Sequence, residues 1–289
     1  MIWYLIAFLA AILLGASSII EKKTLMKEHA MEFSAVVALY CLVLSIPLFF
    51  IIDYTKIQTG ALGILFIESI FAAIAYVFIE KSVRHTEISL SSPLFVLIPA
   101  STVFFAFLFL HESVSWIQLV GIGLLIVGAY ILETKGTDIL EPLRMFKKSR
   151  YVQYILVAVV LYGITGVMDR LLLSNYQMQI ETNMAFFYLF TAIDMIIMLT
   201  VFHDGFKGIV RGTKSAGIWI MLAAALTFAS RYAYIGAVAI VAVGLVSAIK
   251  RTSALFSTVI GGEIFHDTQL IKRSVACIIM VLGAVLIVL

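Results

Sequence analysis

The 289-residue sequence contains few charged residues, and its polar stretches are too short to fold as soluble domains. Charged residues make up 13% of the chain, whereas soluble domains carry roughly 25%. The longest polar connection covers residues 133–150, and hydrophobic residues make up 63% of the whole chain. These proportions exclude a soluble globular protein and predict an integral membrane protein whose function lies among its apolar segments.

Cysteines and catalytic motifs are also scarce. Cys41 and Cys277 both lie in apolar runs, so we expect small packed residues rather than a disulfide. His111 and Glu112 lack the second histidine of a His-Glu-x-x-His zinc site, and neither a nucleophile elbow nor a phosphate-binding loop occurs. The sequence therefore predicts neither an enzyme nor an ATP-driven pump, and no metal or cofactor.

Ten apolar runs are what the sequence does contain. They cover residues 2–20, 33–52, 61–79, 88–110, 114–132, 151–173, 183–202, 216–234, 237–260 and 271–289. A helix needs ~20 residues to cross a bilayer, so each run suffices for one crossing. The runs are continuous and do not alternate apolar with polar residues, which favours helices over barrel strands. We predict an all-α membrane protein with ten transmembrane helices.

The loop charges predict an orientation. The loops after the first, third, fifth, seventh and ninth runs carry nearly all the loop Lys and Arg, whereas the loops after the even runs carry only Lys56. Since cytoplasmic loops are enriched in Lys and Arg, the odd loops are expected in the cytoplasm and both termini outside. Cations beside a membrane need no further partner, so the basic cluster at 147–150 predicts no nucleic-acid binding.

The two halves of the sequence resemble each other. A shift of 155 residues aligns Leu90, Ser92, His111, Glu112 and Gly128 with Leu245, Ser247, His266, Asp267 and Gly283, and a shift of 148 aligns Gly15, Glu21 and Lys22 with Gly163, Asp169 and Arg170. Two units of five crossings place the second copy upside down, which is the inverted-repeat plan of many secondary transporters. We therefore predict a first repeat at 1–135, a connecting loop at 136–150 and a second repeat at 151–289.

Several local features of these runs carry a family resemblance. They are the small-residue turn Gly15-Ala16-Ser17-Ser18, then Pro93 and Pro99, and finally the acidic Glu112 followed by Gly121 and Gly128. With ten runs in two units, they resemble the EamA family of the drug/metabolite transporter superfamily. The resemblance implies an exporter or permease of metabolites, amino acids, nucleotide sugars or drugs, with a central cavity between the halves. It also implies cytoplasmic termini, which conflicts with the loop charges.

Charged residues inside the apolar runs are the candidates for a solute site. Lys250 and Arg251 lie at the middle of the run 237–260, where the first half has Phe95 and Val96. Charges at such depth are costly, about 2.5–3.5 kcal/mol each on insertion scales, and they commonly mark solute or ion pathways. Consecutive helix residues point about 100° apart, so one cation is expected in the pathway and the other in an ion pair.

Acidic residues at similar depth are the expected companions of these cations. Glu68 and Asp194 lie near the middle of their runs, as counter-ions or proton carriers. Arg231 is included as a candidate, although it lies only about four residues from the end of the run 216–234, as Asp169 and Arg170 do in theirs. For those three, side chains that reach interfacial water are the favoured interpretation.

Uncharged residues complete the candidate site. Tyr76 is expected to add a hydrogen-bonding rim to the cavity, or to be ordinary packing. Pro93 and Pro99 are expected to bend the run 88–110. Gly121 and Gly128 share one helix face, with Ala276 and Gly283 at the matching places in the second half, so helices can approach closely there, either within one chain or between two.

The sequence as a whole predicts a secondary transporter or permease. It would move a small polar or anionic metabolite across the cell membrane by alternating access, with proton or ion coupling and a homodimer left open. The alternative is a non-transporting membrane helper or assembly protein, including one that assists lipid translocation, in which the intramembrane charges are structural ion pairs.

Overall fold

Every regular element of the described chain is helical. The computed structural model describes residues 2–25, 30–85, 95, 97–133, 149–202, 206–253 and 270–288. These form α1 (Trp3–Leu25), α2 (Ala30–Ser45), α3 (Thr59–His85), α5 (Ile98–Leu110), α6 (Trp116–Glu133), α8 (Arg150–Ser174), α9 (Ile180–Phe202), α10 (Phe206–Ile240), α11 (Val243–Lys250) and α13 (Leu270–Val288), with 3-10 turns η1 (Ile46–Phe50) and η2 (Tyr54–Lys56). The predicted all-α class is confirmed.

The helices are long and apolar, and their outer faces carry exposed apolar side chains. Six described segments are long and apolar enough to span a bilayer, and three shorter apolar helices lie among them. Large apolar side chains such as Phe104, Phe107 and Ile218 project from their outer faces. A helix satisfies its own backbone hydrogen bonds, which the bilayer interior cannot do, so these bare faces suit contact with lipid.

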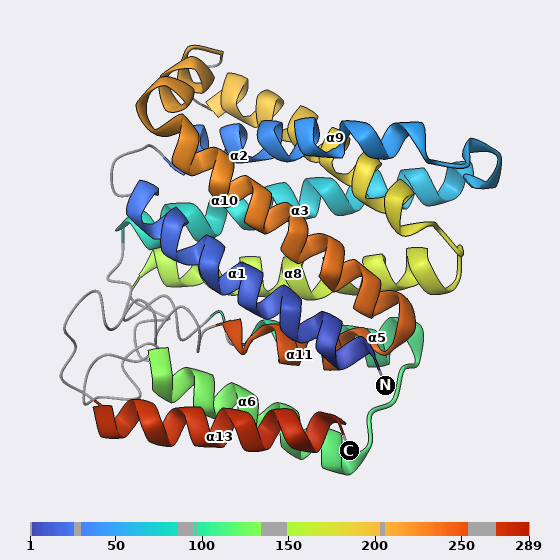
Figure 1. Ribbon diagram of the computed structural model, residues 1–289, viewed down its shortest axis with the longest axis vertical. Helices are drawn as coiled ribbons and strands as arrows, with labels where there is room; N and C mark the ends of the chain where they lie inside the picture. The colour runs from blue at the N-terminus through green and yellow to red at the C-terminus, as the bar shows by residue number, and fades with distance from the viewer. Residues whose placement is uncertain are drawn as a thin grey trace.

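Helices from the two ends of the chain pack against each other. α1 lies along α10, α3 along α8, α2 along α9, and α6 along α13, as Figure 1 shows. If α1, α2 and α3 are equated with α8, α9 and α10, the α1–α10 contact maps onto the α3–α8 contact. The division into repeats at 1–135 and 151–289 stays a prediction, and this reciprocal packing is the pattern that it would produce. Both termini lie at the same end of the bundle (Figure 1).

A glycine crossing joins α6 to α13. A Cβ atom added to Gly121 would lie 2.8 Å from the Gly283 carbonyl oxygen, and one added to Gly283 would lie 2.7 Å from the Gly121 carbonyl oxygen. Added at Gly128, it would lie 3.0 Å from the Ala276 carbonyl oxygen. The backbones meet directly because no side chain separates them. The predicted small-residue face therefore packs within one chain.

The predicted boundary between the runs 216–234 and 237–260 is wrong. α10 continues to Ile240, and only Val241 and Ala242 separate it from α11. No proline interrupts the α10 sequence, so the helix propagates past the polar Arg231 that resembled a span end. Arg231 is consequently nine residues from the end of α10, or roughly 13 Å along the axis.

Pro99 does not bend a helix within the run 88–110, contrary to the prediction. This residue lies in the first turn of α5, where a helix needs no backbone donor, so it begins a helix rather than kinking one. Pro93 lies outside the described residues. Cys41 is buried outside any disulfide and its thiol donates to the Ala224 carbonyl oxygen at 3.5 Å, which agrees with the packing role expected for it; the side chain of Cys277 lies outside the described residues.

We predict that Gly121→Leu destabilises the protein. The new side chain would meet the backbone of α13, and overpacking of this kind costs about 1–3 kcal/mol in the free energy of unfolding. Thermal unfolding of the purified protein in detergent measures the effect. The control is Gly123→Leu on the same helix, because an added Cβ meets nothing within 4 Å there. Equal melting temperatures for the two variants would contradict the proposed packing.

Candidate functional site

Three charged side chains from three helices meet inside the bundle. The Arg231 Nη2 atom on α10 donates to Glu68 Oε1 on α3 at 2.9 Å and to Asp169 Oδ1 on α8 at 3.0 Å. The two carboxylates are buried, with exposed fractions of 0% and 1%. We call Glu68, Asp169 and Arg231 the central ion cluster. It joins one helix of the N-terminal half to two of the C-terminal half.

The walls of the cluster are both polar and aromatic. The Asn183 amide donates to Asp169 Oδ1 at 3.4 Å, and the Arg231 guanidinium lies 3.4 Å from the centre of the Phe187 ring. Glu68 Oε2 and Arg231 Nε are buried and have no hydrogen-bond partner in the described protein. One guanidinium thus faces two carboxylates, and part of the hydrogen-bonding capacity of the cluster is unused.

The burial of this cluster corrects the interfacial interpretation of Arg231 and Asp169. Both were expected to reach interfacial water, but they form an ion pair in which Asp169 is buried and Arg231 is partly buried. The error at Arg231 follows from the length of α10. At Asp169 it follows from packing, because α9 and α10 supply Asn183 and Arg231 as hydrogen-bond donors there. The alignment of Asp169 with Glu21 was the sequence signal that singled out this position.

Lys250 lies at the end of α11, and its ammonium group is 4.3 Å above the centre of the Tyr234 ring. Within the described residues it belongs to none of the ion pairs. A cation above an aromatic face is stabilised by the quadrupole of the ring, but its charge is not neutralised. Arg251 follows in a turn and is half-buried, so the two cations do not share one continuous helix.

The remaining predicted residues make no hydrogen bond or ion pair with the central ion cluster among the described residues. Asp194 accepts a hydrogen bond from Ser69 Oγ at 2.7 Å, so its described partner is a hydroxyl and not a cation. Tyr76 lies on α3, and its buried hydroxyl has no hydrogen-bond partner in the described protein. The expected pairing of Lys250 or Arg251 with Glu68 is replaced by the pairing of Arg231 with Glu68.

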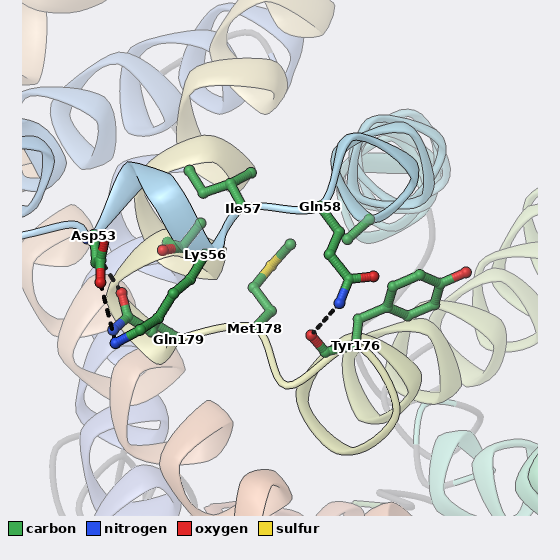
Figure 2. Close-up of a pocket in the computed structure, with 9 residues that line it drawn as sticks. Asp53, Lys56, Ile57, Gln58, Tyr176, Met178 and Gln179 are labelled. Carbon is green, nitrogen blue, oxygen red and sulfur yellow. Dashed lines mark hydrogen bonds and ion pairs between the residues drawn. The ribbon is translucent and has the colours of Figure 1, made fainter.

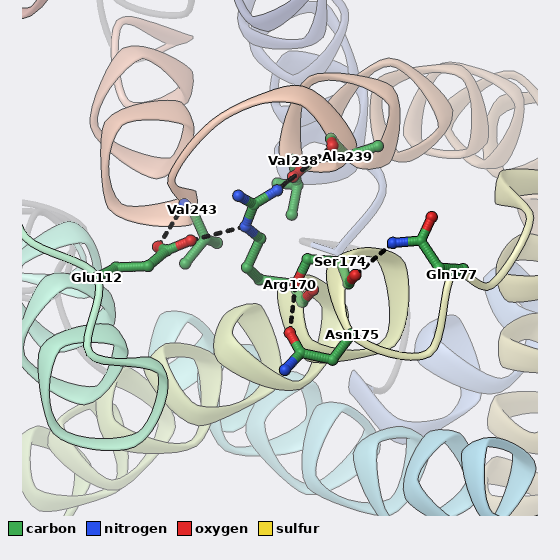
Figure 3. Close-up of polar contacts among 8 residues, drawn as sticks. All are labelled: Glu112, Arg170, Ser174, Asn175, Gln177, Val238, Ala239 and Val243. Atoms are coloured by element: carbon green, nitrogen blue, oxygen red, sulfur yellow. Dashed lines mark hydrogen bonds and ion pairs between the residues drawn. The ribbon is translucent and has the colours of Figure 1, made fainter.

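A second ion pair holds the break between α10 and α11 (Figure 3). Arg170 Nε donates to Glu112 Oε1 at 2.7 Å, while its Nη1 atom donates to the carbonyl oxygen of Val238 at 2.7 Å. Glu112 Oε2 accepts from the Val243 backbone amide at 3.3 Å. A cation thus meets the carbonyl end of α10 and an anion the amide end of α11, as the helix dipoles favour. Arg170 therefore has a structural partner here rather than only interfacial water.

Polar loop contacts join the halves at the same end of the bundle. Gln179 Oε1 accepts from the Asp53 amide at 3.3 Å, and the Gln58 amide donates to the Tyr176 carbonyl at 3.5 Å. Figure 2 shows these side chains around a small pocket, which Lys56 also lines.

Asp53 is fixed within its own turn beside that pocket. The Thr55 hydroxyl donates to Asp53 Oδ1 at 2.6 Å, and Lys56 Nζ lies 3.0 Å from Oδ2. The hydrogen bond from Thr55 lowers the pKa of Asp53 below its ordinary value, and the bond from Lys56 adds a smaller effect in the same direction.

Comparisons with known proteins agree with this architecture. The model of the EamA-like transporter family matches residues 1–134. A solved structure titled only "Crystal structure of protein" is 14% identical, covers 98% of this chain and 95% of its own, and superposes with a TM-score of 0.75, which shows the shared fold. No curated protein matches the sequence. Residues 1–134 thus match the EamA-like transporter family of the drug/metabolite transporter superfamily, whose members are multi-pass membrane transporters and not enzymes.

Proposed function

We propose that this protein is a secondary transporter that moves a small polar or anionic metabolite across the cell membrane by alternating access. The observation that carries the proposal is that the ammonium group of Lys250 has no anionic partner among the described residues. This lysine is a partly buried cation in a chain that matches a transporter family, placed over the Tyr234 ring and outside every ion pair of the described residues. A carboxylate or phosphate of a solute would neutralise it, at a place where desolvation strengthens charge attraction.

Arg231 cannot serve a solute in the same way, because two carboxylates already occupy it. When both are ionised, Glu68 and Asp169 together carry one more negative charge than Arg231 neutralises. The cluster therefore suits a counter-ion or proton-carrying role, and Lys250, with Arg251 beside it, suits solute binding. Asp169 takes the second acidic role that the sequence had assigned to Asp194.

The terminal end of the bundle provides the candidate gate. Arg170–Glu112, Gln58–Tyr176 and Asp53–Gln179 each join the N-terminal half to the C-terminal half there. Alternating access requires such contacts to break when that side opens. Because they are polar and near the bundle end, water can replace them during opening.

The competing function is a membrane helper in which the charges only hold helices together. The central ion cluster is the observation that favours it, since buried ion pairs fix helix positions with or without transport. The two functions predict different transport by a variant in which the three charges of the central ion cluster are removed.

We predict that Lys250→Met lowers solute uptake into proteoliposomes roughly 10- to 100-fold, since a hydrogen bond to a charged group contributes about 1.5–3 kcal/mol. Arg251→Met is measured beside it. The assay screens amino acids, nucleotide sugars and organic anions, with and without a proton gradient. Arg150→Met is the control, because Arg150 is an exposed cation at the start of α8 whose described side-chain bond is to the neighbouring Tyr151, away from the gate and the cluster. Unchanged transport in both Lys250→Met and Arg251→Met would refute the assigned solute site.

Arg231→Met is expected to lower the free energy of unfolding by about 3–5 kcal/mol, because it leaves two buried carboxylates without a cation. The triple variant with Glu68→Gln and Asp169→Asn should regain most of this stability, since neutral groups need no counter-charge. Thermal unfolding and uptake are both measured. A stable triple variant without transport supports a functional cluster. A stable triple variant that transports at the wild-type rate would show that the cluster is structural alone.

The gate predicts an energetic coupling between Glu112 and Arg170. A double-mutant cycle with Glu112→Gln and Arg170→Met should give an interaction energy of about 1–3 kcal/mol by thermal unfolding, because the pair is partly buried and charge-assisted. A matching cycle on Asp53 and Lys56, which are solvent-exposed, should give no measurable coupling. Additive effects at Glu112 and Arg170 would mean that the pair does not hold the gate.

A further inference from the structure

The central ion cluster contains more acid than base. Arg231 Nη2 is 2.9 Å from Glu68 Oε1 and 3.0 Å from Asp169 Oδ1, so one guanidinium contacts two carboxyl groups through the same nitrogen atom. Both acids are almost fully buried, with exposed fractions of 0% and 1%. If both were ionised, the cluster would carry a net negative charge inside the bundle, where an unbalanced charge is costly.

Arg231 is the one described cation that contacts these acids. α3 packs against α2, α8 and α9, and Arg231 reaches Glu68 from α10. On these five helices Arg170 is the cation closest in sequence to the cluster, and it is bonded to Glu112 and to the Val238 carbonyl oxygen. The other Lys and Arg residues of the five helices lie at least thirteen residues from the cluster residue of their own helix, or ~20 Å along its axis. They are too distant to balance the charge by contact.

Other titratable groups near the cluster do not pair with its acids. The set comprises Cys41 on α2, Tyr162 on α8, Tyr188 and Asp194 on α9, Tyr234 on α10 and Lys250 on α11. Lys250 is the cation of this set, and within the described residues its ammonium group lies 4.3 Å from the centre of the Tyr234 ring and in no ion pair. A proton bound to one of the two acids therefore neutralises the cluster most directly.

The two acids differ in the number of donors that stabilise their ionised form. Asp169 Oδ1 accepts from Arg231 and also from the Asn183 amide at 3.4 Å. Glu68 accepts from Arg231 alone, and its Oε2 atom is buried with no hydrogen-bond partner in the described protein. Since hydrogen bonds to a carboxylate favour its ionised form, Asp169 keeps the charge and Glu68 takes the proton. The two carboxyl groups lie within hydrogen-bonding range of each other, so a protonated Glu68 can donate to Asp169.

We propose that Glu68 binds one exchangeable proton, which it shares with Asp169, and that this proton is the coupling ion of the transporter. The closed bundle then contains a neutral Glu68 beside an ionised Asp169–Arg231 pair, with no net charge. Buried acids of this kind carry protons in membrane transporters, and alternating access would bring Glu68 into contact with water when the bundle opens. Proton binding does not depend on transport, whereas the coupling role rests on the proposed function.

Infrared spectroscopy of the purified protein in detergent tests proton binding without any solute. A protonated carboxyl group has a carbonyl stretching band that a carboxylate lacks. The wild-type protein should show such a band at neutral pH, and Glu68→Gln should remove it. Isotopic labelling of glutamate should shift this same band, because the proton lies on Glu68 and not on Asp169. A band that responds to labelled aspartate instead would overturn the assignment to Glu68.

A second variant tests whether the proton is shared. Asp169→Asn should remove the band although Glu68 is retained, because Arg231 then faces a single carboxylate and the charges balance without a proton. This variant and the labelling keep the test decisive if Glu68→Gln fails to fold. Glu181→Gln is the matched control and should leave the band unchanged, since its carboxylate accepts from Tyr232 at 2.9 Å outside the cluster. A band that persists in Asp169→Asn would overturn the shared proton.

Proteoliposomes with a trapped pH-sensitive dye test the coupling role. In the wild-type protein, uptake of labelled amino acids, nucleotide sugars or organic anions should be accompanied by proton movement across the membrane, and Glu68→Gln should lose this movement. Solute uptake without proton movement would overturn the coupling role and leave the transport function standing. A protonated Glu68 in a protein that takes up none of these solutes would remove the proposed function and the coupling role with it, while proton binding would stand.

Discussion

The interaction on which the rest of the structure depends is the contact of Arg231 with Glu68 and Asp169. In an apolar surrounding each of these groups loses several kcal/mol of hydration, and only close contact of opposite charges recovers it. α3, α8 and α10 must therefore hold one relative position to within a hydrogen-bond length. The glycine crossing of α6 and α13 has no such constraint, because its packing is set by backbone contact alone.

The two halves treat aligned acidic positions differently. Asp169 is paired with an arginine and an asparagine, whereas Glu21 is surrounded by hydroxyls and a carbonyl. A symmetric repeat would give both sides the same charge and the same partner. Here one acid is neutralised within the chain, and the other accepts hydrogen bonds from hydroxyl groups. This asymmetry gives the two aligned positions different partners although the predicted repeat gives them the same place in the fold.

The sequence predicted the helices, the glycine face and Glu68 as a buried charge, because each depends on residues near in sequence or on composition. It did not predict the partner of Glu68. The sequence placed Arg231 too near the end of a transmembrane run. Nothing in the local sequence shows that the helix continues past residue 234 to Ile240. The break at Val241–Ala242 was also missed, because its freed backbone groups are satisfied by Arg170 and Glu112 from distant segments.

That break links the candidate gate to the candidate solute site. The first residue of α11, Val243, donates its amide to Glu112, and the last, Lys250, lies over Tyr234. The helix between them has eight residues and is ~12 Å long, so it is short enough to move as one rigid piece. If opening of the terminal end separates Glu112 from Arg170, the amide of Val243 loses its acceptor and α11 loses its anchor. The position of Lys250 then changes together with the gate, which is the coupling that alternating access requires.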